Sequence, residues 1–169
     1  MRHGLTWFSV ACLLCAGVLG KDVPSGFSGT WDIDKNQSTA SSEIPDALEQ
    51  QIKHKKSQMV IKSKWMEPQN GVAPLVLLGV MTTELKLDAN GRQAKKQFGP
   101  FMTTLSTTQD ADGVVTKWHV NANGLPLTSE WRRTLGPDGK TMTLDIKQTG
   151  DGTDKTAKLV FKRRQPQAK

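Results

Sequence analysis

Turn-forming residue pairs recur at short intervals along this 169-residue chain, and they constrain its fold more than any other feature. Asn-Gly and Asp-Gly favour the positive φ angles that tight hairpin turns require. Runs rich in Thr, Val, Ile, Leu and Trp lie between these pairs and alternate apolar with polar residues. This combination predicts successive antiparallel hairpins rather than βαβ units. The turn signals fall at residues 88–91, 110–113, 123–124, 136–139 and 150–152.

The same pattern sets the expected elements. Helix is scarce, although residues 42–51 could either start a short helix capped by Asp46 or begin the second strand. No internal repeat or linker divides the chain, which predicts a single domain. We expect strands over residues 27–34, 47–54, 57–66, 80–88, 92–98, 101–109, 114–122, 126–135, 140–149 and 156–164.

Alternation within these strands assigns their faces. Residues two apart in a strand share a side of the sheet. This rule gathers apolar residues such as Trp31, Ile61 and Leu144 on one face, and charged residues such as Lys62 and Asp145 on the other. A sheet with one apolar face hides that face by curling onto itself, which also removes exposed edges. The sequence therefore predicts an all-β fold, an antiparallel meander β-barrel of about 8–10 strands.

The first twenty residues have the layout of a secretory signal peptide. Arg2 supplies the positive start, residues 5–19 are almost wholly apolar, and small residues precede Lys21. The apolar segment is shorter than the about 20 residues of a comfortable membrane span, so an uncleaved anchor is the alternative. We expect cleavage of residues 1–20, which leaves residues 21–169 as a single barrel domain.

Cysteine content and charge narrow the compartment and the partners. Cys12 and Cys15 are the only cysteines, and both lie in the leader. Export without disulfides suits a bacterial periplasm or an extracellular location. The net charge of +7 favours an anionic membrane surface, a polysaccharide or an acidic ligand, and a solvated basic surface is the alternative. Nucleic acid is not an expected partner of an exported protein.

The first expected strand carries a recognisable motif, Phe27-Ser28-Gly29-Thr30-Trp31. This segment resembles the first strand of the calycins, the lipocalins and fatty-acid-binding proteins, which close a barrel around a lipophilic ligand. The resemblance implies a lipocalin-like barrel whose floor is formed by Gly29, Trp31 and an arginine of the final strand that lies across the indole. Arg163 occupies the corresponding place.

A second resemblance runs across most of the chain. It is to a group of uncharacterised bacterial exported proteins with a Gly-Thr-Trp opening, a Lys-x-x-Ser after it and a late Leu-x-x-Asp-Gly-Lys-x-x-x-Leu hairpin. These motifs correspond here to residues 29–31, 35–38 and 135–144. This resemblance implies export but no particular activity.

Polar residues with inward parity are candidate contacts for a ligand. Arg133 lies two residues from Trp131, so an aromatic wall beside one fixed cation would suit an amphipathic acid; alternatively, Arg133 reaches water or a carboxylate at the strand end. The tryptophans line a cavity or simply fill the core. The inward polar residues are Gln50, His54, Ser63, Thr83, Thr103, Ser129, Arg133 and Gln148. The ligand site that we predict comprises Trp65, Trp118, Trp131, Arg133, Ser129, Ser63 and His54.

Residues 73–81 form a continuous apolar stretch that includes Leu75, Leu77 and Leu78. This stretch could act as a lid over the barrel mouth, or as a patch that touches a membrane surface or a partner. A plug inside the barrel, or the buried start of the next strand, remains equally open.

Catalytic signals are weak. His54 and His119 have opposite face parities, and the sequence holds no phosphate loop or Gly-x-Ser-x-Gly motif. We expect no catalytic residue, metal or cofactor. The sequence thus predicts a non-enzymatic exported protein that binds or carries a small hydrophobic or amphipathic ligand, with an anionic group as one option. The alternatives are a cell-envelope interaction module with a filled core and an enzyme of unknown type.

Overall fold

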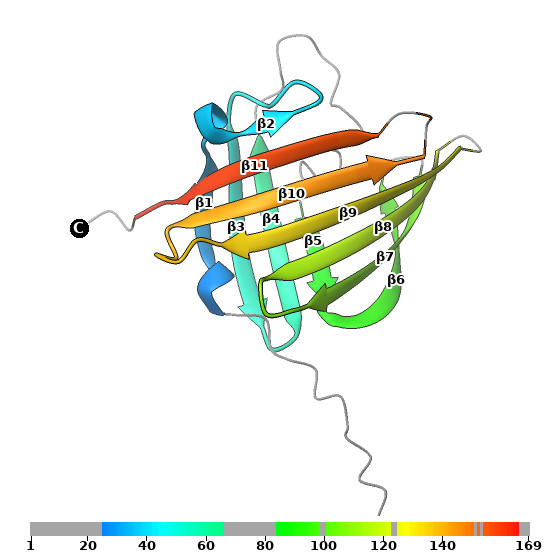
Figure 1. Ribbon diagram of the computed structural model, residues 1–169. Coiled ribbons are helices and arrows are strands. Elements are labelled where there is room, and N and C mark those ends of the chain that lie inside the picture. The colour runs from blue at the N-terminus through cyan, green and yellow to red at the C-terminus, as the bar shows by residue number, and fades with distance from the viewer. Residues whose placement is uncertain are drawn as a thin grey trace, which may run out of the picture.

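The computed structural model describes residues 25–65, 84–98, 101–122, 125–150, 152 and 154–165, and almost all of its regular structure is β (Figure 1). Two short 3₁₀ turns, η1 (Ser25–Phe27) and η2 (Lys35–Gln37), flank the first strand. Among these residues no helix is long and apolar enough to cross a membrane. The strands are β1 (Gly29–Ile33), β2 (Thr39–Ala40), β3 (Leu48–Lys55), β4 (Gln58–Trp65), β5 (Glu84–Asp88), β6 (Asn90–Phe98), β7 (Phe101–Gln109), β8 (Val114–Ala122), β9 (Leu125–Leu135), β10 (Thr141–Thr149) and β11 (Lys155–Arg163).

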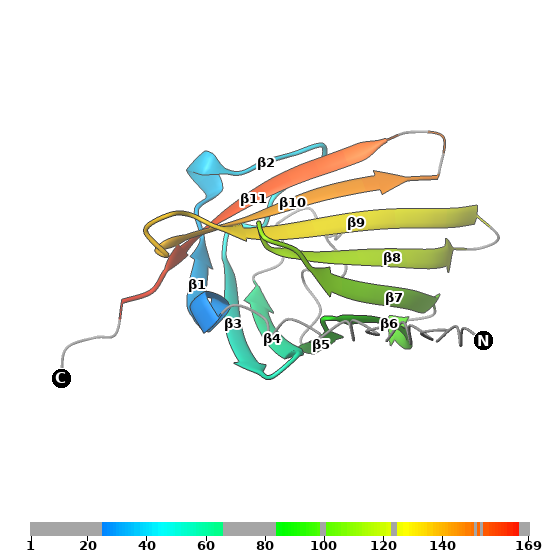
Figure 2. The same cartoon turned by 60° about the horizontal axis from the view of Figure 1, so that its bottom comes forward.

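The strands form one antiparallel sheet that curls into a near-closed barrel of ten strands, as predicted (Figures 1 and 2). Its order is β5-β4-β3-β1-β11-β10-β9-β8-β7-β6, so most strands pair with their sequence neighbours, and the pairing of β1 with β11 joins the two halves. The two-residue β2, which the sequence did not predict, pairs with β11. Residues 42–47 are irregular, and the strand interpretation of residues 42–51 is therefore the correct one from Leu48 onward.

The predicted hairpin at residues 88–91 is wrong, because β5 and β6 are consecutive in sequence but not hydrogen-bonded to each other. Side-chain hydrogen bonds to the backbone of residues 90 and 92 form a corner at this position instead. The Asp88 carboxylate accepts a hydrogen bond from the backbone N–H of Asn90, and the Asn90 side chain accepts one from Arg92. The β6–β7 register shifts between Asn90 and Gln93, and such a bulge bends a strand. The barrel consequently has an unpaired seam between β5 and β6.

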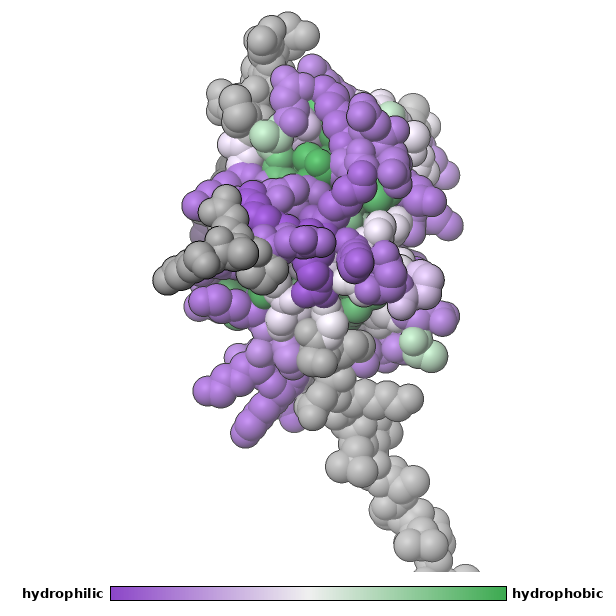
Figure 3. Space-filling model, turned by 90° about the vertical axis from the view of Figure 1, so that its left-hand side faces the viewer, coloured by the Kyte–Doolittle hydropathy of each residue, from purple (hydrophilic) through white to green (hydrophobic). Residues whose placement is uncertain are grey.

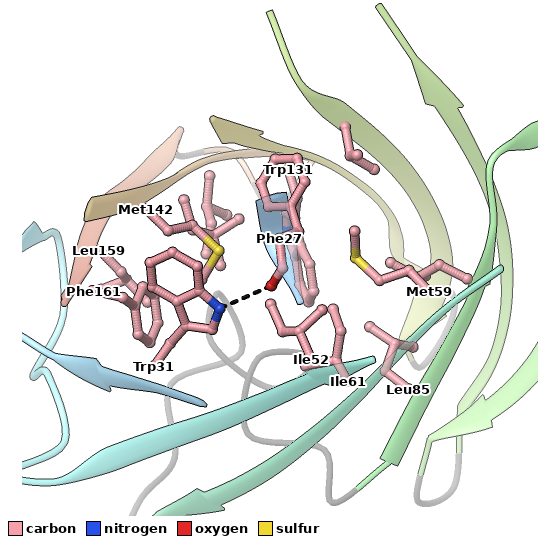
Figure 4. Close-up of a cluster of buried hydrophobic side chains, with 14 of the residues drawn as sticks. Phe27, Trp31, Ile52, Met59, Ile61, Leu85, Trp131, Met142, Leu159 and Phe161 are labelled. Carbon is pink, nitrogen blue, oxygen red and sulfur yellow. Dashed lines mark hydrogen bonds between the residues drawn. The ribbon is translucent and has the colours of Figure 1, made fainter. Parts of the chain in front are cut away.

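Alternation places the apolar faces of the strands inside the barrel, as the sequence predicts. In β10, Met142, Leu144 and Ile146 are buried, and the residues between them are more exposed. Leu144 lies opposite Leu159 of β11 on one side and opposite Arg133 of β9 on the other. Burying a side chain of this size stabilises the fold by about 1.5–3 kcal/mol, so rows of such residues supply most of the driving force. Figure 4 shows this core, with Trp31, Phe27 and Trp131 projecting into it.

The junction of β1 with β11 is reinforced on its outer face. Trp31 pairs in register with Arg163, and Ile33 pairs with Phe161. On the outer side, Lys162 Nζ lies 2.6 Å from Asp34 Oδ2, and this hydrogen bond lowers the pKa of Asp34 below its ordinary value. Ion pairs at solvent-exposed positions contribute little each, so the backbone ladder and the buried side chains carry the closure.

Candidate ligand site inside the barrel

A cluster that we call the floor joins Gly29 and Trp31 of β1 to Arg163, the last residue of β11. Its guanidinium lies over the indole of Trp31, with Cζ 4.3 Å from the ring centroid. The Arg163 nitrogens also donate to three backbone carbonyls: Nε to Gly139 at 2.9 Å, Nη1 to Ser28 at 2.6 Å, and Nη2 to Gly26. With every nitrogen occupied, Arg163 holds the chain ends together and is not available to a ligand.

Gly29 belongs to the same floor for a steric reason. Its φ is +146°, and a Cβ at this position would lie 2.9 Å from Nη1 of Arg163. Glycine is the residue that adopts such a backbone without strain, and it leaves the guanidinium room to reach the carbonyls. Trp31 is fixed in turn by its indole N–H, which donates to the Phe27 carbonyl at 2.9 Å (Figure 4). Gly29, Trp31 and Arg163 thus lie together at the junction of β1 with β11.

Arg133 is the most unusual residue of the interior. Its neighbour Arg132 pairs with Asp110 at 2.8 Å. The carboxylate of Asp110 also accepts hydrogen bonds from the backbone N–H groups of Asp112 and Gly113 in the β7–β8 turn. Because neighbouring residues of a strand face opposite sides, Arg132 lies outside and Arg133 inside. Arg133 is 0% exposed, and none of its three guanidinium nitrogens has a hydrogen-bond partner among the residues that the structure describes.

Burial of Arg133 changes the pKa of its guanidinium. Desolvation lowers the pKa of Arg133 to about 10, which still leaves the guanidinium charged at neutral pH. A buried charge without a counter-charge costs several kcal/mol. The alternative in which Arg133 reaches water or a carboxylate at the strand end is wrong, since the side chain is fully buried and none of its nitrogens has a partner in the described part of the chain. Its Cζ lies 5.8 Å from the Trp131 ring centroid, a weak cation–π contact.

Two tryptophans form a wall beside Arg133. The rings of Trp118 and Trp131 have centroids 4.6 Å apart and are tilted by 44°. Trp131 donates its indole N–H to Ser129 Oγ at 2.8 Å, and Ser129 lies opposite Trp118 in the register of β8 with β9. The two indoles are nearly fully buried, so they place apolar ring surface in the interior next to a cation. Three elements of the predicted site, the two indoles and the guanidinium, are thereby brought together.

The remaining inward polar residues differ in their hydrogen bonds. Gln50 donates to Ser63 Oγ at 3.3 Å, on β3 and β4, and the hydroxyls of Thr107 and Thr116 share a hydrogen bond of 3.2 Å. In contrast, Thr103 Oγ1 and Gln148 Nε2 are buried and have no partner in the described part of the chain. Alternation identified both as inward residues but could not reveal that they lack partners, and neither was included in the predicted ligand site.

Other predicted site residues lie elsewhere. His54 Nδ1 is 2.7 Å from Ser28 Oγ at the floor, separated in sequence and space from the tryptophan wall. Thr83, Leu75, Leu77 and Leu78 fall outside the described residues. His119 is exposed and contacts Thr128. Within the described ranges no group of three or more His, Cys, Asp or Glu side chains could hold a metal ion.

Trp65 lines an open groove at the barrel rim and packs only partly against the core. The groove has a volume of about 330 Å³ and mixes apolar with charged side chains of both signs. On the side of the molecule shown in Figure 3, hydrophilic side chains cover most of the surface, and a few apolar ones are visible between them. The groove is lined by Asp32, Ile33, Asp46, Ala47, Leu48, Glu49, Lys64, Trp65 and Arg164.

No protein-family model matches the chain, and no curated protein sequence matches it. Among solved structures, zebrafish ileal bile acid-binding protein complexed with cholic acid has a TM-score of 0.51 at 12% sequence identity, covering 83% of this chain and 100% of that chain. An abundant heat soluble (SAHS) protein from Ramazzottius varieornatus has a TM-score of 0.49 at 11% identity, covering 82% of this chain and 96% of its own. The likeness to the zebrafish protein is one of fold: this chain is a lipocalin-like antiparallel barrel.

Proposed function

We propose that this chain is an exported, non-enzymatic lipocalin-like protein that binds a small amphipathic molecule through an anionic group inside the barrel. The observation that carries the proposal is Arg133, a fully buried guanidinium whose three nitrogens have no hydrogen-bond partner within the described ranges. A carboxylate or a similar anion would match these donors, since the planar guanidinium fork pairs with two oxygens at once. The Trp118–Trp131 wall would take the apolar body of the same ligand.

Two further observations support the proposal. The signal-like residues 1–20 favour export of the barrel. The zebrafish ileal bile acid-binding protein, which shares the fold, is complexed with cholic acid, and this favours a small-molecule ligand for the present barrel as well.

Ligand entry requires movement, because the side chains around Arg133 have almost no exposed surface. The seam between β5 and β6 is the place where strands can separate without breaking ladder hydrogen bonds. Binding that depends on such an opening is slower than typical association, which runs at about 10⁵–10⁷ M⁻¹s⁻¹. We therefore expect slow association with a rate that saturates as ligand concentration rises.

The test compares a fatty acid with the primary alcohol of the same chain length, using protein stripped of bound lipid and tryptophan fluorescence as the signal. The wild type should bind the acid more tightly, because only the carboxylate pairs with Arg133. Arg133→Met should abolish that preference. Arg132→Met is the matched control, since Arg132 is the next residue on β9 but lies outside and pairs with Asp110. Equal binding of acid and alcohol by the wild type would reject an anion site at Arg133.

A further inference from the structure

The interior holds unsatisfied hydrogen-bonding groups at a second position, well separated from Arg133. Gln148 Nε2 and Thr103 Oγ1 are both buried, and neither has a partner in the part of the chain described. Buried polar groups in folded proteins are almost always hydrogen-bonded, so each exception requires a reason. Gln109 Oε1 is a further exception, but its residue is partly exposed at the end of β7.

The register places this second position relative to the first. Arg133 lies opposite Leu144 on β10, and Gln148 is four residues further along the same strand. At about 3.4 Å per residue, the two positions are about 14 Å apart along the wall. Trp131, opposite Ile146, lies between them. Along the inner wall, the Arg133 cation is therefore followed by Trp131 and Ile146 and then by the Gln148 amide.

Thr103 belongs to the amide end of this wall. Gln148 lies opposite Ser129, and Ser129 lies opposite Trp118. Trp118 lies opposite Leu105 on β7, and Thr103 is the next inward residue beyond Leu105, away from the row of Arg133. Thr103 is thus three strands from Gln148 and one inward row beyond it, with Ser129 and Trp118 between them. The amide N–H₂ of Gln148 donates hydrogen bonds, so it suits a hydroxyl or carbonyl oxygen.

We propose that the barrel recognises a two-ended ligand: an amphipathic acid that carries a hydroxyl or carbonyl group about 14 Å from its acid group. This inference rests on the proposed function and adds the second polar contact. Arg133 binds the acid, the Trp118–Trp131 wall packs against the apolar body, and the Gln148 amide hydrogen-bonds to the distal oxygen. An unsubstituted acid leaves this amide desolvated and unsatisfied, and the site discriminates against it for that reason.

The experiment measures the affinity of lipid-stripped wild-type protein for three acids of equal chain length, by tryptophan fluorescence and calorimetry. The first is unsubstituted, the second carries a hydroxyl about 14 Å from the carboxylate, and the third carries a hydroxyl at mid-chain. The distal hydroxyl should tighten binding by about three- to tenfold. The mid-chain hydroxyl should weaken it, because it is forced against the indoles.

Variants then assign the contact. Gln148→Leu should reduce the preference for the distal hydroxyl while the unsubstituted acid still binds. Gln51→Leu is the matched control on an exposed strand position and should keep the preference. Equal affinity of the wild type for the first two acids overturns the two-ended ligand but leaves the proposed function intact. Failure of all three acids to bind overturns the proposed function, and this inference with it. The wild-type comparison decides the question even if a variant fails to fold.

Discussion

Replacing Arg133 with methionine should make the ligand-free barrel more stable, because the guanidinium is buried and has no counter-charge among the residues that the structure describes. The pKa of Arg133 is lowered from 12.5 to about 10 by desolvation. The unfolded chain therefore binds more protons between these pH values, and at neutral pH the folded state carries the full cost of the buried charge. A depression of this size corresponds to roughly 3 kcal/mol. Methionine keeps much of the packing volume and removes the charge, so a gain of about 1–3 kcal/mol is expected.

The assay is urea and thermal unfolding of lipid-stripped protein at pH 7. For a domain of this size, the gain should raise Tm by about 2–4 °C for each kcal/mol. Bound ligand must be absent, because it would stabilise the wild type by mass action and mask the difference. Arg132→Met should change stability by less than about 1 kcal/mol, since its ion pair with Asp110 is exposed. A ligand-free Arg133→Met protein that is clearly less stable than the wild type would refute the reasoning, because it would mean that the guanidinium makes stabilising contacts.

Three further predictions concern the floor, the loss of stability at acid pH and the leader. Gly29→Ala should lower the free energy of unfolding by about 1–3 kcal/mol in urea titrations, because the backbone is left-handed there and the new Cβ would crowd Arg163; unchanged stability would contradict that role. Asp34 has a pKa held below 3.8 chiefly by its hydrogen bond from Lys162, so its contribution is present above that value and is lost as pH falls through the lowered pKa. Asp34→Asn should therefore make the free energy of unfolding less sensitive to pH below about 4. The same loss of stability with falling pH in both proteins would exclude this contribution. Protein recovered from the periplasm or medium of its own host should begin at Lys21 by intact mass, and an uncleaved chain would favour the anchor.

The strands could be predicted well because their signals are local. β8 has the bounds predicted, residues 114–122, and β7 likewise spans 101–109. Turn pairs and period-two alternation act within a few residues, and each strand satisfies them whatever its neighbours are. The turn at residues 88–91 has the same local signal but produces a corner rather than a hairpin, because the bulge in β6 and the curvature of the sheet decide whether two strands pair.

The sequence could predict which residues of the candidate site face the barrel interior, but not which hydrogen bonds these residues make. Alternation placed Arg133, Gln148 and Thr103 on the inner face, and it placed Gln50 and Ser63 there on equal terms. Only the packed structure shows that Gln50 and Ser63 hydrogen-bond to each other across β3 and β4, and that Arg133, Gln148 and Thr103 have buried polar atoms without a partner among the described residues. Partners of this kind come from residues far apart in sequence, and no local pattern encodes them.

What the sequence by itself determined was the β class, the positions of most strands along the chain and the choice of inner face, because backbone dihedrals and side-chain alternation are properties of short segments. The tertiary structure alone decided that β5 and β6 part at a seam, that Trp65 lies at a rim groove, and that Arg133 is buried with no counter-charge among the described residues. These features depend on how the sheet curves and on which groups are removed from water together. Desolvation is a property of the assembled barrel, and the proposed ligand site follows from it.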